Sequence, residues 1–187
     1  MNLWRNWLAR SRSRSGQALV EFMLVVLILM VLLFGLIDFS RALSTWQILI
    51  NVSREGSNLA ARGSGTLGTN TTQVISNALS IVVINANPLN ISQNGKVIIT
   101  AVENSNGVFV VTQQMSLGAL ATNSVVAPHG TASTPIMPIS ATAAGTFPQP
   151  NQTTYITEVY YSYSPVTPIG TLVGLTLPST LYDVAYF

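Results

Sequence analysis

The feature that most constrains this chain is an apolar run near its N-terminus. From Ala18 to Ile37 it holds twenty residues with one charge, Glu21. A helix of that length spans ~30 Å, which matches the hydrocarbon core of a bilayer. Thirteen of the sixteen residues from Phe22 to Ile37 are Leu, Ile, Val or Phe, and together they favour insertion by roughly 4–8 kcal/mol. We therefore expect a transmembrane segment over residues 17–38, in which the charge of Glu21 has a function.

Charge is distributed unevenly about this run. Four arginines and no acid precede Gly16, whereas four basic and six acidic residues follow it. The positive-inside rule then predicts a cytoplasmic N-terminus and an extracytoplasmic remainder. A basic arm can also bind nucleic acid or anionic lipid, but its place beside a membrane segment favours the role in topology. Nucleic acid is therefore not an expected partner.

A secretory signal peptide is the other interpretation of a basic segment before an apolar run. Such peptides have an apolar region of only ~7–15 residues and a cleavage site of small residues. Here the run is longer and continues into Asp38-Phe39-Ser40-Arg41. Removal by an ordinary signal peptidase is therefore disfavoured.

The chain after the apolar run is long enough for one modest domain. From Asp38 to Phe187 there are 150 residues, which suffice for a single core. Charged residues make up 7% of the chain, against a typical ~25%. That composition is common in proteins that lie outside the cell or pack into assemblies. The chain has no Cys, so its fold needs no disulfide.

The helical pattern continues beyond the membrane segment. Phe39, Leu43, Trp46 and Ile50 recur at spacings of four, three and four, which predicts an amphipathic continuation over residues 39–63. The glycines at positions 63, 65 and 68 then end the pattern. We expect one helix from about residue 17 to residue 62, some ~70 Å long.

The remaining residues predict a second helix and a small sheet. Residues 71–86 have an apolar face of Val74, Ala78 and Ile81, although the β-branched run at 81–84 would also suit a strand. Strands are expected at residues 96–103, 108–117, 155–164 and 181–187, with a long loop at 118–152. Residues 169–177 are apolar and suit a short helix or a contact surface. The predicted fold class is α+β, with an antiparallel sheet in a domain over residues 64–187.

No group of residues indicates catalysis or a cofactor. His129 is the only histidine, and a metal site needs more ligands. Residues 63–68 match G-x-G-x-x-G, but they follow a helix and lack an acid for a ribose. There is no G-x-S-x-G sequence, and the carboxylates of the outer domain are scattered. We expect no enzyme activity, no metal and no cofactor. The tyrosines of residues 155–163 are expected to pack in the sheet or to form an adhesive face.

Three motifs carry a resemblance to a known family. The first is Gly16-Gln17-Ala18-Leu19-Val20-Glu21-Phe22, which is similar to the prepilin peptidase site of type IV pilin-like proteins. With LLFGLIDFSRAL and NVSREGSNLAARG, it resembles the TadE-like minor pilins of Tad/Flp pilus systems. The second motif contains G-x-x-D-x-x-R, supplied by Gly35, Asp38 and Arg41. The third is looser and is supplied by Arg54, Glu55, Gly56 and Arg62. The resemblance covers roughly residues 15–63.

The resemblance implies a type IV pilin-like fold and a structural role in a pilus. Residues 1–16 would be a leader, cut between Gly16 and Gln17 by prepilin peptidase. Glu21 and Phe22 would serve assembly, with the new amine of one subunit neutralising Glu21 of its neighbour. Helix contacts are expected at the sites given in the second and third motifs: Gly35, Asp38, Arg41, Arg54 and Glu55. Expected partners are the peptidase, other pilin and pilus-assembly subunits, and the lipid of the inner membrane, which the chain would cross once.

Two interpretations compete with a cleaved pilin. The runner-up is an uncleaved single-span anchor that displays a small domain for adhesion or envelope interaction. An extracytoplasmic enzyme ranks third. Two of the motif residues also have simpler interpretations. Glu21 could extend to the cytoplasmic headgroups without any role in assembly. Asp38 and Arg41 could form a solvated i,i+3 pair on the helix surface. Cleavage after Gly16 separates the first two interpretations.

Overall fold

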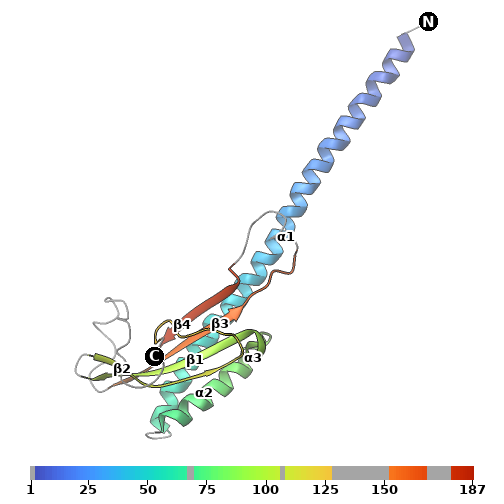
Figure 1. Ribbon diagram of the computed structural model, residues 1–187. Coiled ribbons are helices and arrows are strands. Elements are labelled where there is room, and N and C mark those ends of the chain that lie inside the picture. The colour runs from blue at the N-terminus through green and yellow to red at the C-terminus, as the bar shows by residue number, and fades with distance from the viewer. Residues whose placement is uncertain (1–2, 67–69, 106–107, 128–151, 168–177) are drawn as a thin grey trace. The chain divides into compact units, whose positions relative to one another are not determined.

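The structure is a computed structural model that describes residues 3–66, 70–105, 108–127, 152–167 and 178–187. Side chains of the first helix are described over residues 16–64. The elements in chain order are α1 (Leu3–Thr66), α2 (Thr71–Asn85), α3 (Ile91–Asn94), β1 (Gly95–Ser105), β2 (Val108–Leu117), β3 (Thr153–Ser162) and β4 (Thr180–Tyr186). Figure 1 labels each of them. The predicted α+β class is confirmed, with a long first helix, a further helix and a small antiparallel sheet.

The chain divides into two compact units. The first consists of Met1–Ala42 and Pro165–Leu177, and the second of Leu43–Ser164 and Pro178–Phe187. Helix α1 contributes its N-terminal part to the first unit and its C-terminal part to the second. The sheet, α2 and α3 belong to the second unit.

The sheet has four antiparallel strands in the order β2-β1-β3-β4. The register between β1 and β2 shifts once, between Ala101 and Val102, whereas β1–β3 and β3–β4 are unbroken. Side chains alternate between the two faces of a strand. Each face of this sheet therefore has its own core.

The larger core lies between the sheet and the helices α1 and α2. It combines Leu49, Val52 and Ala60 of α1 with one face of α2 and the odd-numbered apolar residues of β1 and β3. Small residues occupy much of the face of α1 that contacts the sheet. A Cβ placed on Gly56 would lie 2.8 Å from Cγ2 of Thr157. Glycine at this position therefore allows the helix to approach β3 closely.

The smaller core lies on the opposite face of the sheet. Val102, Val111 and Ile156 pack there with Ala127, which belongs to the segment that follows β2. Below that segment Glu158 is fully buried. One of its oxygens accepts hydrogen bonds from the amides of Val125 (2.9 Å) and Val126 (3.3 Å). These bonds attach the segment to the sheet.

Three hydroxyl groups complete the environment of Glu158. Tyr160 and Tyr182 donate to Oε1 at 2.9 and 3.2 Å, and Ser124 donates to Oε2. Burial, followed by the charge of Glu158, raises the pKa of both tyrosines above the usual range. Tyr160 and Tyr182 also stack as a tilted pair with centroids 4.8 Å apart. The predicted role of tyrosines in sheet packing is therefore confirmed at Tyr160.

Several element boundaries differ from the prediction. Helix α1 begins by Leu3 and ends at Thr66, so Gly63 and Gly65 lie within it. Helix α2 is capped by Asn70, whose side chain accepts from the amide of Gln73 at 3.3 Å. The short helix α3 was not predicted. Strand β2 has the predicted bounds, and the other three strands differ by one to two residues at their ends. The expectations for residues 128–151 and 169–177 lie outside the described residues.

The apolar residues predicted for the outer part of α1 are largely not the ones that pack on the sheet. Phe39, Leu43 and Trp46 are 54%, 40% and 47% exposed. The face that packs on the sheet is offset from them and begins at Leu49. The reason is that the tightest helix–sheet contact uses small side chains, which a search for large apolar residues passes over. On α2, Ile81 is likewise exposed, and the buried face runs through Val74, Ile75, Ala78, Leu79 and Val82.

Candidate functional site

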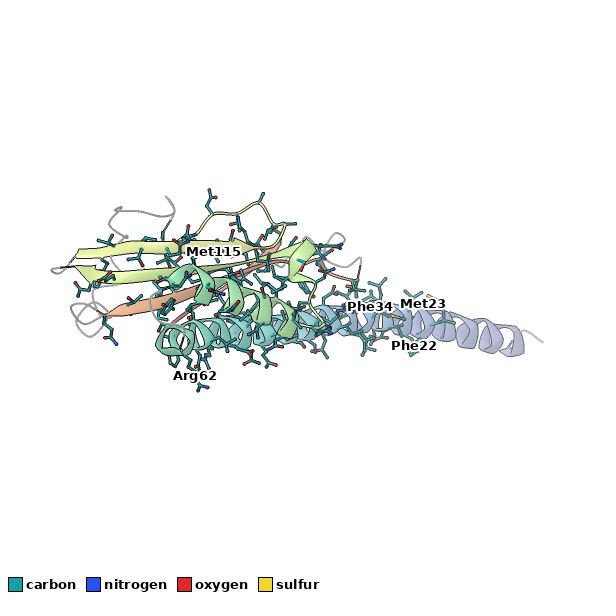
Figure 2. All side chains as sticks on the ribbon, turned by 90° about the horizontal axis from the view of Figure 1, so that it is seen from below. Phe22, Met23, Phe34, Arg62 and Met115 are labelled. Atoms are coloured by element: carbon teal, nitrogen blue, oxygen red, sulfur yellow. The ribbon has the colours of Figure 1, made fainter. Side chains whose placement is uncertain are left out.

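The apolar N-terminal half of α1 has no packing partner within its own unit for most of its length. Apart from half-buried Val26 and Val31, its large side chains from Leu19 to Ile37 are 36–67% exposed. Figure 2 shows Phe22, Met23 and Phe34 projecting outward from the helix. The most apolar window has a mean hydropathy of 3.0 and is 0% buried. Among the described residues α1 is the one helix long and apolar enough to cross a membrane, which is compatible with a single-pass anchor.

Glu21 lies at the start of this apolar surface. Its side chain is exposed, with Phe22 beside it at 67% exposure. No hydrogen bond or ion pair reaches Glu21 from the side chains that the structure describes. In a bilayer an acid at this place has no counter-charge among the side chains that are described, and this is costly unless another group supplies one.

No close contact in the described part of the chain requires glycine at position 16 or 35. A Cβ built on either of them meets nothing within 4 Å. Small residues in membrane helices allow neighbouring helices to approach closely. Gly35 therefore leaves room for another helix to approach α1 closely. Gly16 lies one residue before the predicted cleavage point at Gln17, and both are exposed.

Asp38 is used within the chain. It is only 5% exposed, and its Oδ1 accepts from the amides of Val166 (3.0 Å) and Thr167 (3.2 Å). The hydroxyl of Thr167 donates to Oδ2. The carboxyl group thus attaches a segment 128 residues away to α1 where the apolar surface ends. Arg41, the other charged residue of the second motif, is exposed.

Arg54 and Glu55 lie in the second unit, where they flank a groove beside β4. Arg54 is exposed, and Oε1 of half-buried Glu55 accepts from the side-chain amide of Asn85 at 2.8 Å. The groove has a volume of about 720 Å³. Arg54, Asn58, Leu59 and Arg62 line one side of it, and residues 184–187 line the other. Figure 2 shows Arg62 projecting from the last turns of α1.

Sequence reasoning missed the residues through which α1 binds β4. Ser53 donates a hydrogen bond to Oδ2 of Asp183, and Ser57 donates to the carbonyl of Ala185 at 2.9 Å. With Gly56 and Ala60 these serines form a stripe at spacings of three, one and three. A helical period in small residues is the signal that could have identified this face.

The structure gives no basis for a metal or cofactor site in its described part. Among those residues no three His, Asp or Glu side chains converge, and the predicted bystander His129 lies outside them. The acids of the sheet domain are separated, with Asp183 bound to Ser53 and Glu158 enclosed by its own network. What the described surfaces offer is contact with other macromolecules or lipid.

Comparison with known proteins supports this assessment. Residues 16–58 match the model of the family described as TadE-like protein. The resemblance seen in the sequence is thereby confirmed over that segment. The matched residues all lie in α1. No significant match was found among curated proteins or among solved structures.

Proposed function

We propose, from the TadE-like match over residues 16–58, that this chain is a minor pilin or pseudopilin of a Tad/Flp-type pilus. It enters the inner membrane through residues 17–38, and prepilin peptidase removes residues 1–16. The subunit then joins other pilus proteins through α1, while the sheet domain lies outside the cytoplasm. The basic leader supports this orientation.

One observation carries the proposal. Glu21 stands five residues after Gly16 on an exposed apolar helix, without a partner among the described side chains, inside the segment that matches the family. Cleavage after Gly16 would create an α-amine on Gln17. Opposite charges ~4 Å apart attract far more strongly in a low-dielectric helix bundle than in water. The amine of one subunit can therefore neutralise Glu21 of the next and fix the register between them.

Protein sequencing of the N-terminus tests the processing step. The full-length protein is extracted from membranes of cells with and without an active prepilin peptidase. We expect a start at Gln17 only when the peptidase is present. A start at Met1 in both samples would favour the uncleaved anchor and would remove the charge partner proposed for Glu21.

Substitution of Glu21 tests the assembly step. We expect Glu21→Ala to insert into the membrane normally, to be cleaved, and to be absent from sheared pili. Glu103→Ala serves as a matched control, because this acid lies in the sheet domain and has no part in the proposal. Normal amounts of the Glu21→Ala protein in pili would contradict the proposed register contact and favour a side chain that only reaches the headgroups.

A further inference from the structure

Asp38 stands where the apolar run of α1 ends. The twenty residues from Ala18 to Ile37 hold one charge, and a helix of that length matches the hydrocarbon core of a bilayer. Asp38 is the next residue. If residues 17–38 span the membrane as proposed, its carboxyl group lies at the outer boundary of that core. There it enters the interfacial layer, which is ~5–8 Å thick on each side of a bilayer.

The carboxyl group of Asp38 holds a second part of the chain at this level. The amides of Val166 and Thr167 both donate to its Oδ1, at 3.0 and 3.2 Å, and the hydroxyl of Thr167 donates to Oδ2. Both residues belong to the same compact unit as the N-terminal part of α1. The backbone at residues 166–167 therefore lies within one side-chain length of the point where α1 leaves the hydrocarbon core.

These hydrogen bonds suit surroundings that are poor in water. An acid beside the hydrocarbon core is costly unless partner groups satisfy it, and so is a backbone outside a helix. Asp38 is buried, and its bonds satisfy the carboxyl group and two backbone amides together. In a connection surrounded by water, water itself would serve those amides. Residues 166–167 can thus approach lipid without leaving the two amides unpaired.

The side chains at this level are apolar and exposed. Val166 is 61% exposed, and Phe39, which follows Asp38 on α1, is 54% exposed. No charged residue stands between Glu158 and Asp183 in the part of the sequence that contains Val166. Exposed connections between strands are usually rich in polar residues. Apolar side chains beside the end of a membrane segment therefore fit lipid better than water.

A basic residue lies one turn further out. Arg41 is exposed and follows Asp38 by three residues, or ~4.5 Å along the helix. That distance places it at the level of the headgroups, whose phosphates bind guanidinium groups well. Apolar side chains followed by a cation reproduce the order of acyl chains and headgroups in the outer leaflet.

We propose that Val166 and Phe39 form a surface that contacts lipid, which Asp38 holds in the outer interfacial layer of the bilayer. The chain would then contact the membrane at two places far apart in sequence, through the apolar run of α1 and through the segment at Val166. The inference rests on the membrane insertion included in the proposed function, but it does not require cleavage or assembly into a pilus.

Lipid is favoured over a second copy of the chain because of where this surface lies. In a single subunit, whatever the chain itself leaves uncovered at the level of Asp38 meets the bilayer. A second copy would have to displace that lipid, and no charge on Val166 or Phe39 would direct it there. Coverage by another protein is therefore an outcome that the experiment should distinguish from contact with lipid.

Electron paramagnetic resonance of a spin-labelled protein tests the inference. The chain has no Cys, so Val166→Cys provides a single labelling site in the full-length protein. One subunit is placed in each nanodisc of phosphatidylcholine. The measured quantity is the collision rate of the label with oxygen divided by that with a water-soluble nickel complex, which rises with depth in lipid. Val125→Cys is the matched control, because this valine is 63% exposed and lies in the sheet domain. Leu29→Cys, within the apolar run, reports insertion of α1.

We expect the ratio at position 166 to be several times the ratio at position 125 and lower than the ratio at position 29. Asp38→Ala should lower the ratio at 166 toward that at 125, because two amides lose their acceptor, and should leave the ratio at 29 unchanged. Glu103→Ala, which removes an acid of the sheet domain, should leave all three ratios unchanged.

Three results would overturn the inference. Equal ratios at positions 166 and 125 would place Val166 in water, and a high ratio at position 29 would then leave membrane insertion intact. Low ratios at both 29 and 166 would overturn the membrane insertion as well. A label at 166 that neither reagent reaches would show that protein covers it. A ratio at 166 that stays high in Asp38→Ala would refute the role assigned to Asp38. The proposed pilus function is tested separately, by cleavage and by Glu21→Ala.

Discussion

Replacement of Gly56 by alanine tests whether this glycine serves the protein's own domain or a neighbouring subunit. A Cβ at this position would lie 2.8 Å from Cγ2 and 2.9 Å from Oγ1 of Thr157. Thr157 is fully buried. Both γ atoms face the glycine, so any staggered rotation of the threonine leaves at least one of them close. The clash must therefore be relieved by moving the helix or the strand.

The size of the effect follows from two opposing contributions. Overpacking of a well-packed core costs about 1–3 kcal/mol. Alanine in place of glycine in a helix interior gains about 1 kcal/mol. We expect Gly56→Ala to lower the free energy of unfolding of the sheet domain by about 1 kcal/mol, or ~4 °C in melting temperature. In a Thr157→Ala background both γ atoms are gone, so the same change should be stabilising by about 1 kcal/mol.

Thermal unfolding of the four proteins of this cycle provides the assay. Near-ultraviolet circular dichroism of the sheet tyrosines follows the domain in the full-length chain in detergent. The expected coupling energy is about 2 kcal/mol, well above the few tenths expected of independent sites. Equal effects of Gly56→Ala in both backgrounds would refute the argument that contact with Thr157 is what requires glycine.

Gly35→Ala is the matched comparison on the same helix. Its Cβ would meet nothing within 4 Å, so we expect the melting temperature of the sheet domain to remain unchanged. Incorporation into pili should fall if Gly35 contacts another subunit. A lower melting temperature in this variant would contradict the assignment of Gly56 to folding and Gly35 to assembly, because Gly35 would then also support the fold.

Three further predictions concern polar groups. Asp38→Ala should speed amide exchange in the segment that it binds roughly tenfold, measured by hydrogen exchange, since about 1–2 kcal/mol of hydrogen bonding is lost; unchanged exchange would contradict the role. Ser53→Ala should destabilise the domain by about 1–3 kcal/mol in thermal unfolding, because Asp183 loses its donor. In an Asp183→Asn background, the additional Ser53→Ala change should cause no further loss of stability. Burial and the charge of Glu158 raise the pKa of Tyr182 above 10.0, so the folded state holds this proton more tightly and domain stability should fall as pH rises above about 10. Melting temperatures that are constant across that pH range would refute the burial of this hydroxyl.

The secondary structure was largely predictable because its signals are local. β-branched runs marked β1 and β3, and the spacing of Val74 and Ala78 marked α2. The cap of α2 has a weaker local signal, because Asn70, Thr71 and Thr72 follow one another and each residue type can cap a helix. Asn70 is the residue that caps it.

The face of α1 that packs on the sheet was less predictable, because an apolar residue on this helix can be covered either by the domain or by something outside the chain. Phe39 and Trp46 follow a helical period but remain exposed in this chain, whereas the face bound to the sheet is built from Ser53, Gly56 and Ser57. Periodicity identifies an apolar face without saying whether the protein's own domain, lipid or a partner covers it.

The candidate site was predictable where its residues are close in sequence. Gly16, Glu21 and the apolar run were recognised together, and the family match covers them. The contacts of Asp38 were not, since Val166 lies 128 residues further along the chain. A local rule could suggest only the i,i+3 neighbour, Arg41.

The bonds between α1 and β4 also constrain the order in which the domain can be completed. Ser53 and Asp183 are 130 residues apart, and Ser57 and Ala185 are 128 apart. Under the proposed topology, the outer part of α1 is synthesised early. Ser53 and Ser57 then remain without their β4 partners until more than a hundred further residues have been made. Until β4 arrives, the edge of β3 is unpaired and the small-residue face of α1 is uncovered. Closure of the domain is therefore a late, long-range step, and under the proposed function a subunit would be complete only once β4 has paired.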